Sequence, residues 1–188
     1  FARRDGEGYV ISGQKIWTSR AAHSDLMILL ARTTPIAEVA RRHDGLSLFI
    51  VDMREAGERL TVRPIRTMMN HSTTEIFMDE MRVPAENLIG DEGKGFRYVL
   101  SGMNAERILI GAECIGDAKW FIDRSAAYSC ERVVFGQPIG RNQGVQFPIA
   151  KAYPQMRAAE LMVREAAGLY DLGRPCGAEA NMAKMLAS

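Results

Sequence analysis

The sequence predicts a two-domain α+β protein, in which an antiparallel β-barrel is followed by an up-down bundle of long helices. Residues 1 to 92 hold many short β-rich runs with no helical pattern between them. Residues 93 to 188 hold long stretches in which apolar residues recur every three or four positions. Many short strands without intervening helices favour an antiparallel sandwich or barrel. We therefore place the domain boundary between residues 92 and 93.

Short runs of β-forming residues in the first domain predict its strands. Alternation is clearest where Ile76 and Met78 point to one face and Phe77 and Asp79 to the other. Gly13 separates the first two runs and predicts a break between two short strands. The runs are GYVIS, KIWTS, LMILLAR, LSLFIVD, LTVRPI and TEIFMDEMRV.

Three helices are predicted in the second domain. The first covers some thirty proline-free residues from Phe96 to about Tyr128, and VVFGQPIG ends it. In the second helix Glu160 interrupts an otherwise apolar spacing, and Pro148 and Pro154 predict a late start or a kink. A third helix begins near Ala178. Two long helices joined by a short loop indicate antiparallel neighbours in a bundle.

Composition excludes several classes of function. The chain has 188 residues, and its 24 basic side chains nearly balance 23 acidic ones, so neither nucleic acid nor an anionic membrane is an expected partner. No apolar run approaches the roughly 18 residues of a transmembrane helix. The chain opens without methionine and closes within a helical pattern, so we expect a fragment of a longer protein.

Cysteine and histidine usage indicates neither a disulfide framework nor a metal site. The cysteines are few, odd in number and far apart, which favours reduced thiols in a cytosol-like compartment. The histidines show no ligand spacing, so we expect no metal. These residues are Cys114, Cys130, Cys176, His23, His43 and His71.

Glu106 is the candidate catalytic residue that the pattern alone provides. Gly102, Met103, Leu109 and Ile110 lie one turn away on the same stripe of the first helix, so the carboxylate shares a largely apolar face. Desolvation of a carboxylate favours its protonated form, which suits a general base that faces a carbon acid. The same pattern is also typical of a surface glutamate or a salt-bridge partner.

Four motifs in series resemble the acyl-CoA dehydrogenase family of flavoproteins. They are DGEGYVISGQKIWTSRAAHSD, VPAENLIGDEGKGF, NAERILIGAECIG and ERVVFGQPIGRNQGVQFPIA. The resemblance covers essentially the whole chain and implies the middle β-barrel domain and the first part of the carboxy-terminal helical domain. A complete member also has an amino-terminal helical domain and further carboxy-terminal helices.

The resemblance implies FAD as the cofactor and assigns residues to its two ends. Trp17, Thr18 and Ser19 match the strand against the isoalloxazine ring, where Ser19 could donate a hydrogen bond to N5. The alternative is a core tryptophan beside turn-capping hydroxyls. Arg132 and Phe135, with Gln143, match the loop that grips the pyrophosphate end of a flavin bound mainly by a neighbouring subunit. This implies a homo-oligomer, either a dimer or a homotetramer.

The alternative interpretation of Arg132, Phe135 and Gln143 is an ordinary loop between helices. In that case Arg132 would pair with Glu131 or be solvated. Asn104 and Arg107 match positions that contact the CoA part of the substrate in the family, although both also suit a solvated helix face. Arg107 lies about 100° around the helix from Glu106, so we expect no direct ion pair between them.

The implied activity is FAD-dependent α,β-dehydrogenation of an acyl-CoA thioester. Most family members carry the catalytic carboxylate later in the chain, but a subset carries it immediately before an arginine, where this chain has Glu106. That residue would remove the pro-R α-proton while the β-hydrogen leaves as hydride to flavin N5. An electron-transfer flavoprotein would accept the electrons, in the cytoplasm or the mitochondrial matrix.

Two alternatives remain open at this point. One is a flavin-dependent oxidase or monooxygenase on the same fold, and the other is a non-catalytic scaffold that binds CoA or flavin. The sequence leaves the length and branching of the acyl group undetermined.

Overall fold

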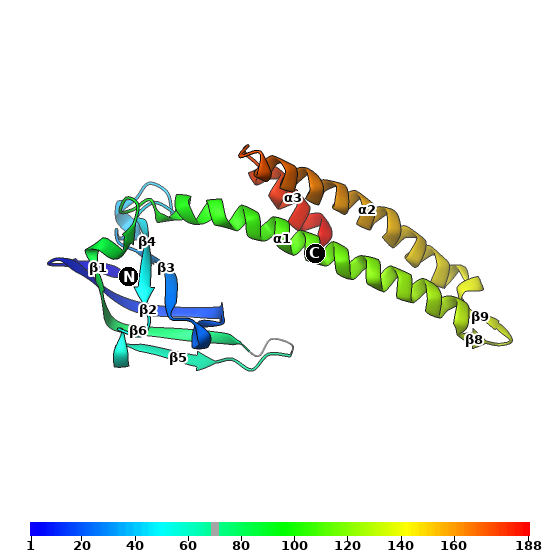
Figure 1. Cartoon of the computed structure of the whole chain (residues 1–188), viewed down its shortest axis with the longest axis horizontal. Helices are drawn as coiled ribbons and strands as arrows, with labels where there is room; N and C mark the ends of the chain where they lie inside the picture. Colours follow the sequence, from blue (N-terminus) through cyan, green and yellow to red (C-terminus); the bar gives the residue numbers. More distant parts are fainter. Residues whose placement is uncertain (69–71) are drawn as a thin grey trace. The chain divides into compact units, whose positions relative to one another are not determined.

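The computed structural model describes residues 1–68 and 72–188, and these residues form two compact units. The first unit comprises Phe1–Leu100 and consists mainly of strands, whereas the second comprises Ser101–Ser188 and consists mainly of helices (Figure 1). His71, one of the histidines considered as metal ligands, lies outside the described residues.

Two sheets build the first unit. Their strands are β1 (Ala2–Asp5), β2 (Gly8–Ser19), β3 (Leu26–Arg32), β4 (Leu46–Asp52), β5 (Leu60–Pro64), β6 (Thr73–Pro84) and β7 (Leu88–Ile89). One sheet has the order β1-β2-β6-β5 and the other the order β3-β4-β7, and every pairing within them is antiparallel. The antiparallel character expected from the sequence is therefore confirmed.

Short 3-10 helices connect several elements. They are η1 (Ala21–His23), η2 (Ile36–Glu38), η3 (Gly57–Arg59), η4 (Ala85–Asn87) and η5 (Ile139–Arg141).

The predicted break at Gly13 is wrong, because β2 is one strand of 12 residues. Its partner β6 is equally long and pairs with it from end to end. A shift in register between Ile11 and Gly13 absorbs the glycine, which has a φ of 149°. A glycine in a strand often marks such an irregularity instead of ending the strand.

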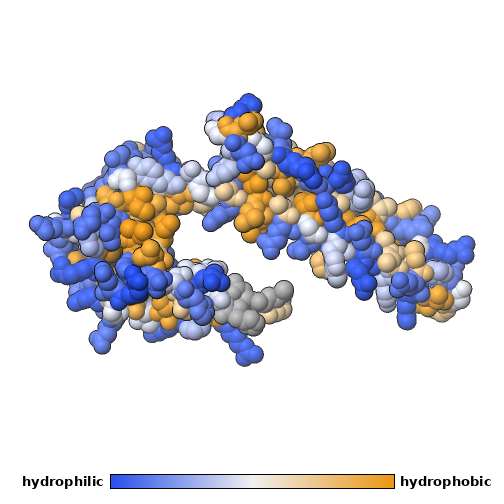
Figure 2. Space-filling model, viewed as in Figure 1, coloured by the Kyte–Doolittle hydropathy of each residue, from blue (hydrophilic) through white to orange (hydrophobic). Residues whose placement is uncertain are grey.

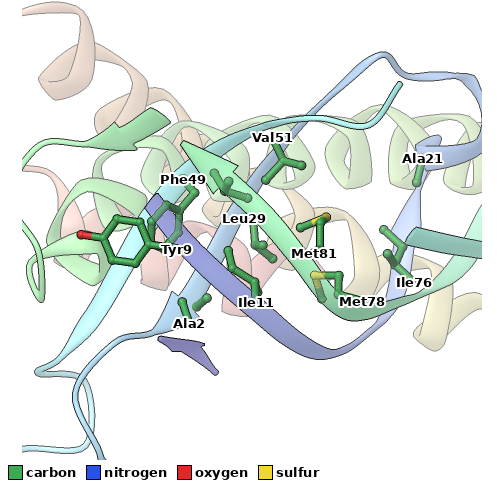
Figure 3. Close-up of a cluster of buried hydrophobic side chains, with 12 residues drawn as sticks. Ala2, Tyr9, Ile11, Ala21, Leu29, Phe49, Val51, Ile76, Met78 and Met81 are labelled. Carbon is green, nitrogen blue, oxygen red and sulfur yellow. The ribbon is translucent and has the colours of Figure 1, made fainter. Parts of the chain in front are cut away.

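The core of the first unit lies between its strands (Figure 3). Ile76 and Met78 are buried, Phe77 is half-buried and Asp79 is exposed, which confirms the predicted alternation. Tyr9 contacts Phe49 edge to face, with 4.9 Å between the ring centroids. The buried cluster comprises Ala2, Tyr9, Ile11, Ala21, Leu29, Ala31, Phe49, Val51, Ile76, Met78, Met81 and Val83.

Three helices and a small hairpin form the rest of the chain. They are α1 (Gly95–Glu131), β8 (Val133–Val134), β9 (Gln137–Pro138), α2 (Gln143–Asp171) and α3 (Gly177–Ala187). The three predicted helices are confirmed, and α1 begins within the first unit.

The late start predicted for the second helix is wrong. Helix α2 begins at Gln143 and continues through Pro148 and Pro154. Each proline lacks the N–H that would bond the carbonyl four residues earlier, at Gly144 and Ala150. All four residues are exposed, so water can solvate the two freed carbonyls.

Glu160 interrupts the apolar pattern of α2 because it binds three cations. Its side chain is nearly buried, and its carboxylate accepts hydrogen bonds from Lys119 of α1 at 2.9 Å, Arg157 at 2.5 Å and Arg164 at 2.9 Å. These bonds, chiefly from Lys119 and Arg164, lower the pKa of Glu160 from 4.5 to about 2. The carboxylate therefore stays charged among the apolar residues that join the helices.

Buried apolar residues of the helical unit form the second core. They are Ile108, Ile115, Met156, Ala159, Val163, Ala166, Cys176, Ala180 and Ala183. No helix in the described part of the chain combines the length and hydropathy that a membrane-spanning segment requires.

Candidate functional site

A β-bulge in β2 carries the candidate flavin-facing tryptophan. Lys15 pairs with Ile76 and Thr18 pairs with Thr74, so two residues of β2 stand opposite one residue of β6. Trp17 is one of the two, and its φ of 64° is left-handed. Its side chain is 65% exposed. The alternative of a core tryptophan does not describe Trp17 in this chain.

Thr18 and Ser19 follow directly on the same exposed stretch of β2. The Thr18 carbonyl accepts a hydrogen bond from Thr74 Oγ1 at 2.8 Å. Ser19 pairs with Thr73 in the strand register and is exposed. Among the described residues nothing bonds its hydroxyl, which is therefore free to donate. An exposed indole face beside a free hydroxyl suits an aromatic ring that has a hydrogen-bond acceptor.

The β8–β9 hairpin carries the second group of candidates. Phe135 and Gly136 form its two-residue turn with φ values of 52° and 79°, as in a type I′ turn. Phe135 is 100% exposed at the tip. The backbone carbonyl of Arg132 accepts a hydrogen bond from Ile139 N–H at 2.9 Å, which closes the hairpin.

Arg132 has no ion pair among the described residues, so the alternative pairing with Glu131 is absent in this chain. Gln143 is exposed and begins α2. Arg132 thus lies at the base of the hairpin and Phe135 at its tip, whereas Gln143 belongs to the helix that follows.

A cavity of about 640 Å³ lies where α1 and α2 meet this connection. None of the three predicted residues lines it, although Arg141, the last residue of η5, does. Its walls are Ala126, Ser129, Cys130, Pro138, Gly140, Arg141, Gln146, Phe147, Ile149 and Ala150.

Glu106 lies on the exposed face of α1, with Leu109 67% exposed beside it. The opposite face packs into the helical core through Ile108, two residues and about 200° further around the helix. Among the described residues Glu106 has no hydrogen bond and no ion pair. Glu106 therefore lies on an exposed, partly apolar stripe of α1. The desolvation of its carboxylate stays a prediction. Figure 2 shows such exposed hydrophobic residues on each unit.

The predicted CoA-contacting residues are joined to each other. Arg107 Nη1 donates a hydrogen bond to Asn104 Oδ1 at 3.2 Å, and both side chains are half-buried. Arg107 makes no ion pair with Glu106, as the helical spacing predicted. No cation in the described chain therefore neutralises the candidate base.

Sequence reasoning missed two residues that hold the bulge. Lys15 Nζ donates a hydrogen bond to the Leu30 carbonyl of β3 at 2.8 Å, and burial lowers the pKa of Lys15. Thr74 is the other, through its bond to Thr18. The available signal was a lysine directly before the apolar pair of Ile16 and Trp17 in a strand.

Two family profiles match this chain. Residues 1–81 match the middle domain of acyl-CoA dehydrogenase, and residues 93–188 match the carboxy-terminal domain of acyl-CoA dehydrogenase. Together they account for nearly the whole sequence.

Individual proteins give the same pattern. An acyl-CoA dehydrogenase of Bacillus subtilis is 36% identical over 181 residues, which is 96% of this chain and 47% of that protein. The structure of butyryl-CoA dehydrogenase from Megasphaera elsdenii covers 99% of this chain and 48% of its own, with a TM-score of 0.86 and 29% identity. PigA, solved with FAD and proline, gives a TM-score of 0.88 at 25% identity, over 99% of this chain and 48% of its own. The chain thus spans about half the length of the proteins it matches.

Proposed function

Because the chain belongs to the acyl-CoA dehydrogenase family, we propose that the whole protein is an FAD-dependent oxidoreductase that introduces an α,β double bond into an acyl-CoA thioester. The observation that supports this most is the succession of the two family domains along one chain, each matched over nearly its whole unit. The B. subtilis relative and the M. elsdenii structure carry names of the same activity.

The residues of β2 fit the flavin ring of FAD. Trp17 offers an exposed indole face for stacking, and Ser19 offers a ring nitrogen a hydroxyl that has no hydrogen bond among the described residues. Bound FAD would supply the chemistry of accepting a hydride from the β-carbon of the substrate. Trp17 and Thr18 would fix the ring, and Ser19 would stabilise negative charge on it through its hydrogen bond.

Glu106 would act as the general base that takes the α-proton. Its carboxylate has no hydrogen bond and no ion pair among the described residues. The apolar stripe with Leu109 and Ile110 would exclude water once an acyl chain covers it. A carboxylate that loses water in this way gains proton affinity, which is what proton abstraction from carbon requires.

Asn104 and Arg107 would hold the CoA part of the substrate. Among the described residues their mutual bond uses one guanidinium N–H of Arg107, so other N–H groups could bind phosphate or carbonyl oxygens. They project from the same turns of α1 as Glu106, so one helix would bind the carrier and carry the base.

The β8–β9 hairpin would complete the flavin site of a second copy. Arg132 has no ion pair among the described residues and is permanently charged, which suits a pyrophosphate, and Phe135 is fully exposed at the hairpin tip. This predicts that FAD binding requires a homo-oligomer. An electron-transfer flavoprotein would accept the electrons that the reaction releases.

Anaerobic mixing of the purified full-length protein with acyl-CoA thioesters of different length and branching tests this function. We expect the visible absorbance of oxidised flavin to bleach with at least one of them, and the enoyl-CoA product to form. A parallel measurement in air separates a dehydrogenase from an oxidase, because only an oxidase consumes oxygen stoichiometrically. A flavin-loaded protein that no acyl-CoA bleaches would overturn the proposal.

A further inference from the structure

Trp17 has a backbone conformation that tryptophan rarely adopts. Its φ of 64° lies in the left-handed region, where the Cβ of any residue other than glycine crowds the following carbonyl. Such conformations persist only where the surrounding structure over-determines them, and they cluster at functional sites. Both residues of the bulge that contains Trp17, Ile16 and Trp17 itself, are exposed.

Lys15 fixes the chain immediately before the bulge. Its ammonium group donates a hydrogen bond to the Leu30 carbonyl at 2.8 Å, and Leu30 belongs to the other sheet. The side chain is half-buried, and no carboxylate pairs with the ammonium among the described residues. Lys15 therefore links β2 to β3 at the last regularly paired residue before the bulge.

Thr74 fixes the chain immediately after the bulge. Its hydroxyl donates a hydrogen bond to the Thr18 carbonyl at 2.8 Å, in addition to the strand pairing of the same two residues. Thr74 is 1% exposed, whereas Thr18 is half-buried. The peptide that follows Trp17 is therefore held by a side-chain hydrogen bond, as is the chain before Ile16.

We propose that Lys15 and Thr74 are positioning residues that hold Trp17 in its left-handed conformation and so fix the indole plane that faces the flavin. The proposal rests on the function proposed above, because it takes β2 as the flavin-facing strand. Neither Lys15 nor Thr74 would touch the flavin. They would act through their hydrogen bonds to the Leu30 and Thr18 carbonyls, which fix the chain on either side of the bulge; we call this pair of bonds the clamp.

The full-length protein with Lys15→Met and Thr74→Val tests the clamp. Methionine keeps the apolar stem but removes the donor, and valine keeps the branched shape but removes the hydroxyl. We expect each to speed hydrogen exchange in the segment 14–19, with or without FAD, and to weaken FAD binding about tenfold. Lys15→Arg retains a donor and should restore most of the affinity, which a general folding defect would not allow.

Matched controls come from the same strand and from another helix. Thr73→Val makes the same change at the residue next to Thr74, and the Thr73 hydroxyl makes no hydrogen bond among the described residues. Lys151→Met removes an exposed lysine of α2 that makes no bond there. Both controls should leave exchange in the segment 14–19 and FAD affinity unchanged.

A double-mutant cycle with Trp17→Gly separates positioning from stability. Glycine adopts a positive φ without strain, so the clamp has nothing to hold once Trp17 is replaced. We expect Lys15→Met to cost about tenfold in FAD affinity with Trp17 present and less than about twofold with glycine there. Equal costs in both backgrounds, or unchanged exchange in Lys15→Met and Thr74→Val, would overturn the clamp.

Failure of the proposed function gives a different result. If the wild-type protein binds no FAD, or if acyl-CoA does not bleach it, the function fails. In that case, hydrogen exchange in the segment 14–19 of the FAD-free protein still tests whether Lys15 and Thr74 hold the bulge. If exchange and FAD affinity are unchanged while bleaching persists, the clamp is wrong and the function stands.

Discussion

Glu160 of α2 lies 2.9 Å from the ammonium of Lys119 on α1, and this ion pair joins two helices that also contribute residues to the apolar core of the helical unit. Arg157 and Arg164 of its own helix complete the set of cations. A buried carboxylate with three donors is tolerated because each oxygen is bonded, whereas the same carboxylate without them would oppose folding.

The first prediction follows from the pKa of Glu160, which is about 2 in the folded chain against 4.5 ordinarily. The unfolded chain binds this proton more readily, so the stability from Glu160 is complete above pH 4.5 and disappears as pH falls towards 2. Glu160→Gln should therefore be less stable than wild type at neutral pH, and the gap should close between pH 4.5 and 2. Denaturant unfolding followed by circular dichroism across that range measures the gap.

Glu165→Gln is the control for that measurement, since Glu165 is exposed on the same helix and has no ion pair among the described residues. Its free energy of unfolding should equal that of wild type across the same pH range. A gap between Glu160→Gln and wild type that stays constant down to pH 2 would contradict the assigned role.

The second prediction concerns Gly95 at the start of α1. A Cβ there would lie 2.5 Å from the Leu48 backbone nitrogen and 2.6 Å from the Ser47 carbonyl carbon, which are backbone atoms that cannot turn away. Gly95→Ala should destabilise the full-length protein by about 1–3 kcal/mol. Equilibrium unfolding in denaturant measures this loss.

Gly102→Ala makes the matching change in the same helix, where a Cβ meets nothing within 4 Å. It should stabilise the protein by up to about 1 kcal/mol, because alanine is the better helix former. If both variants shift the unfolding midpoint in the same direction, the close contact of Gly95 with β4 is wrong.

The third prediction compares two isoleucines of the first unit. Ile76 is 0% exposed in the core, whereas Ile28 on β3 is 68% exposed. Ile76→Ala should cost about 2–5 kcal/mol of unfolding free energy, through lost burial and the cavity that remains. Ile28→Ala should change it by less than about 0.5 kcal/mol. Comparable losses in chemical denaturation would mean that Ile28 is buried in the full-length protein by residues beyond this chain.

The sequence pattern was sufficient to predict the longer strands and the three helices. The clearest alternation belongs to the strand Thr73–Pro84, whereas Leu26–Arg32 was recognisable as a short apolar run between turn signals. The pattern failed where tertiary pairing overrides local preference. Gly13 does not end β2, since β6 pairs with it on both sides, and α2 tolerates Pro148 and Pro154 on its exposed face.

The sequence proposes the residues of the candidate site but does not give their geometry. The motifs pointed to Trp17 and to Phe135, yet a left-handed tryptophan has no sequence signature. Glu160 looked like a defect in an apolar stripe, because its partner Lys119 lies 41 residues away. The apolar stripe around Glu106 was predictable from the spacing of its residues. Its burial depends on what covers the stripe, which is exposed in this chain.

The central claim is that Glu106 is the base, and replacing it in the full-length protein tests this most directly. Glu106→Gln should keep its FAD and its affinity for acyl-CoA, while the rate of anaerobic flavin bleaching falls by about 10²–10⁴. Glu113→Gln, an exposed glutamate two turns further along α1, should bleach at the wild-type rate. Bleaching by Glu106→Gln at the wild-type rate would contradict the claim and place the base elsewhere in the enzyme.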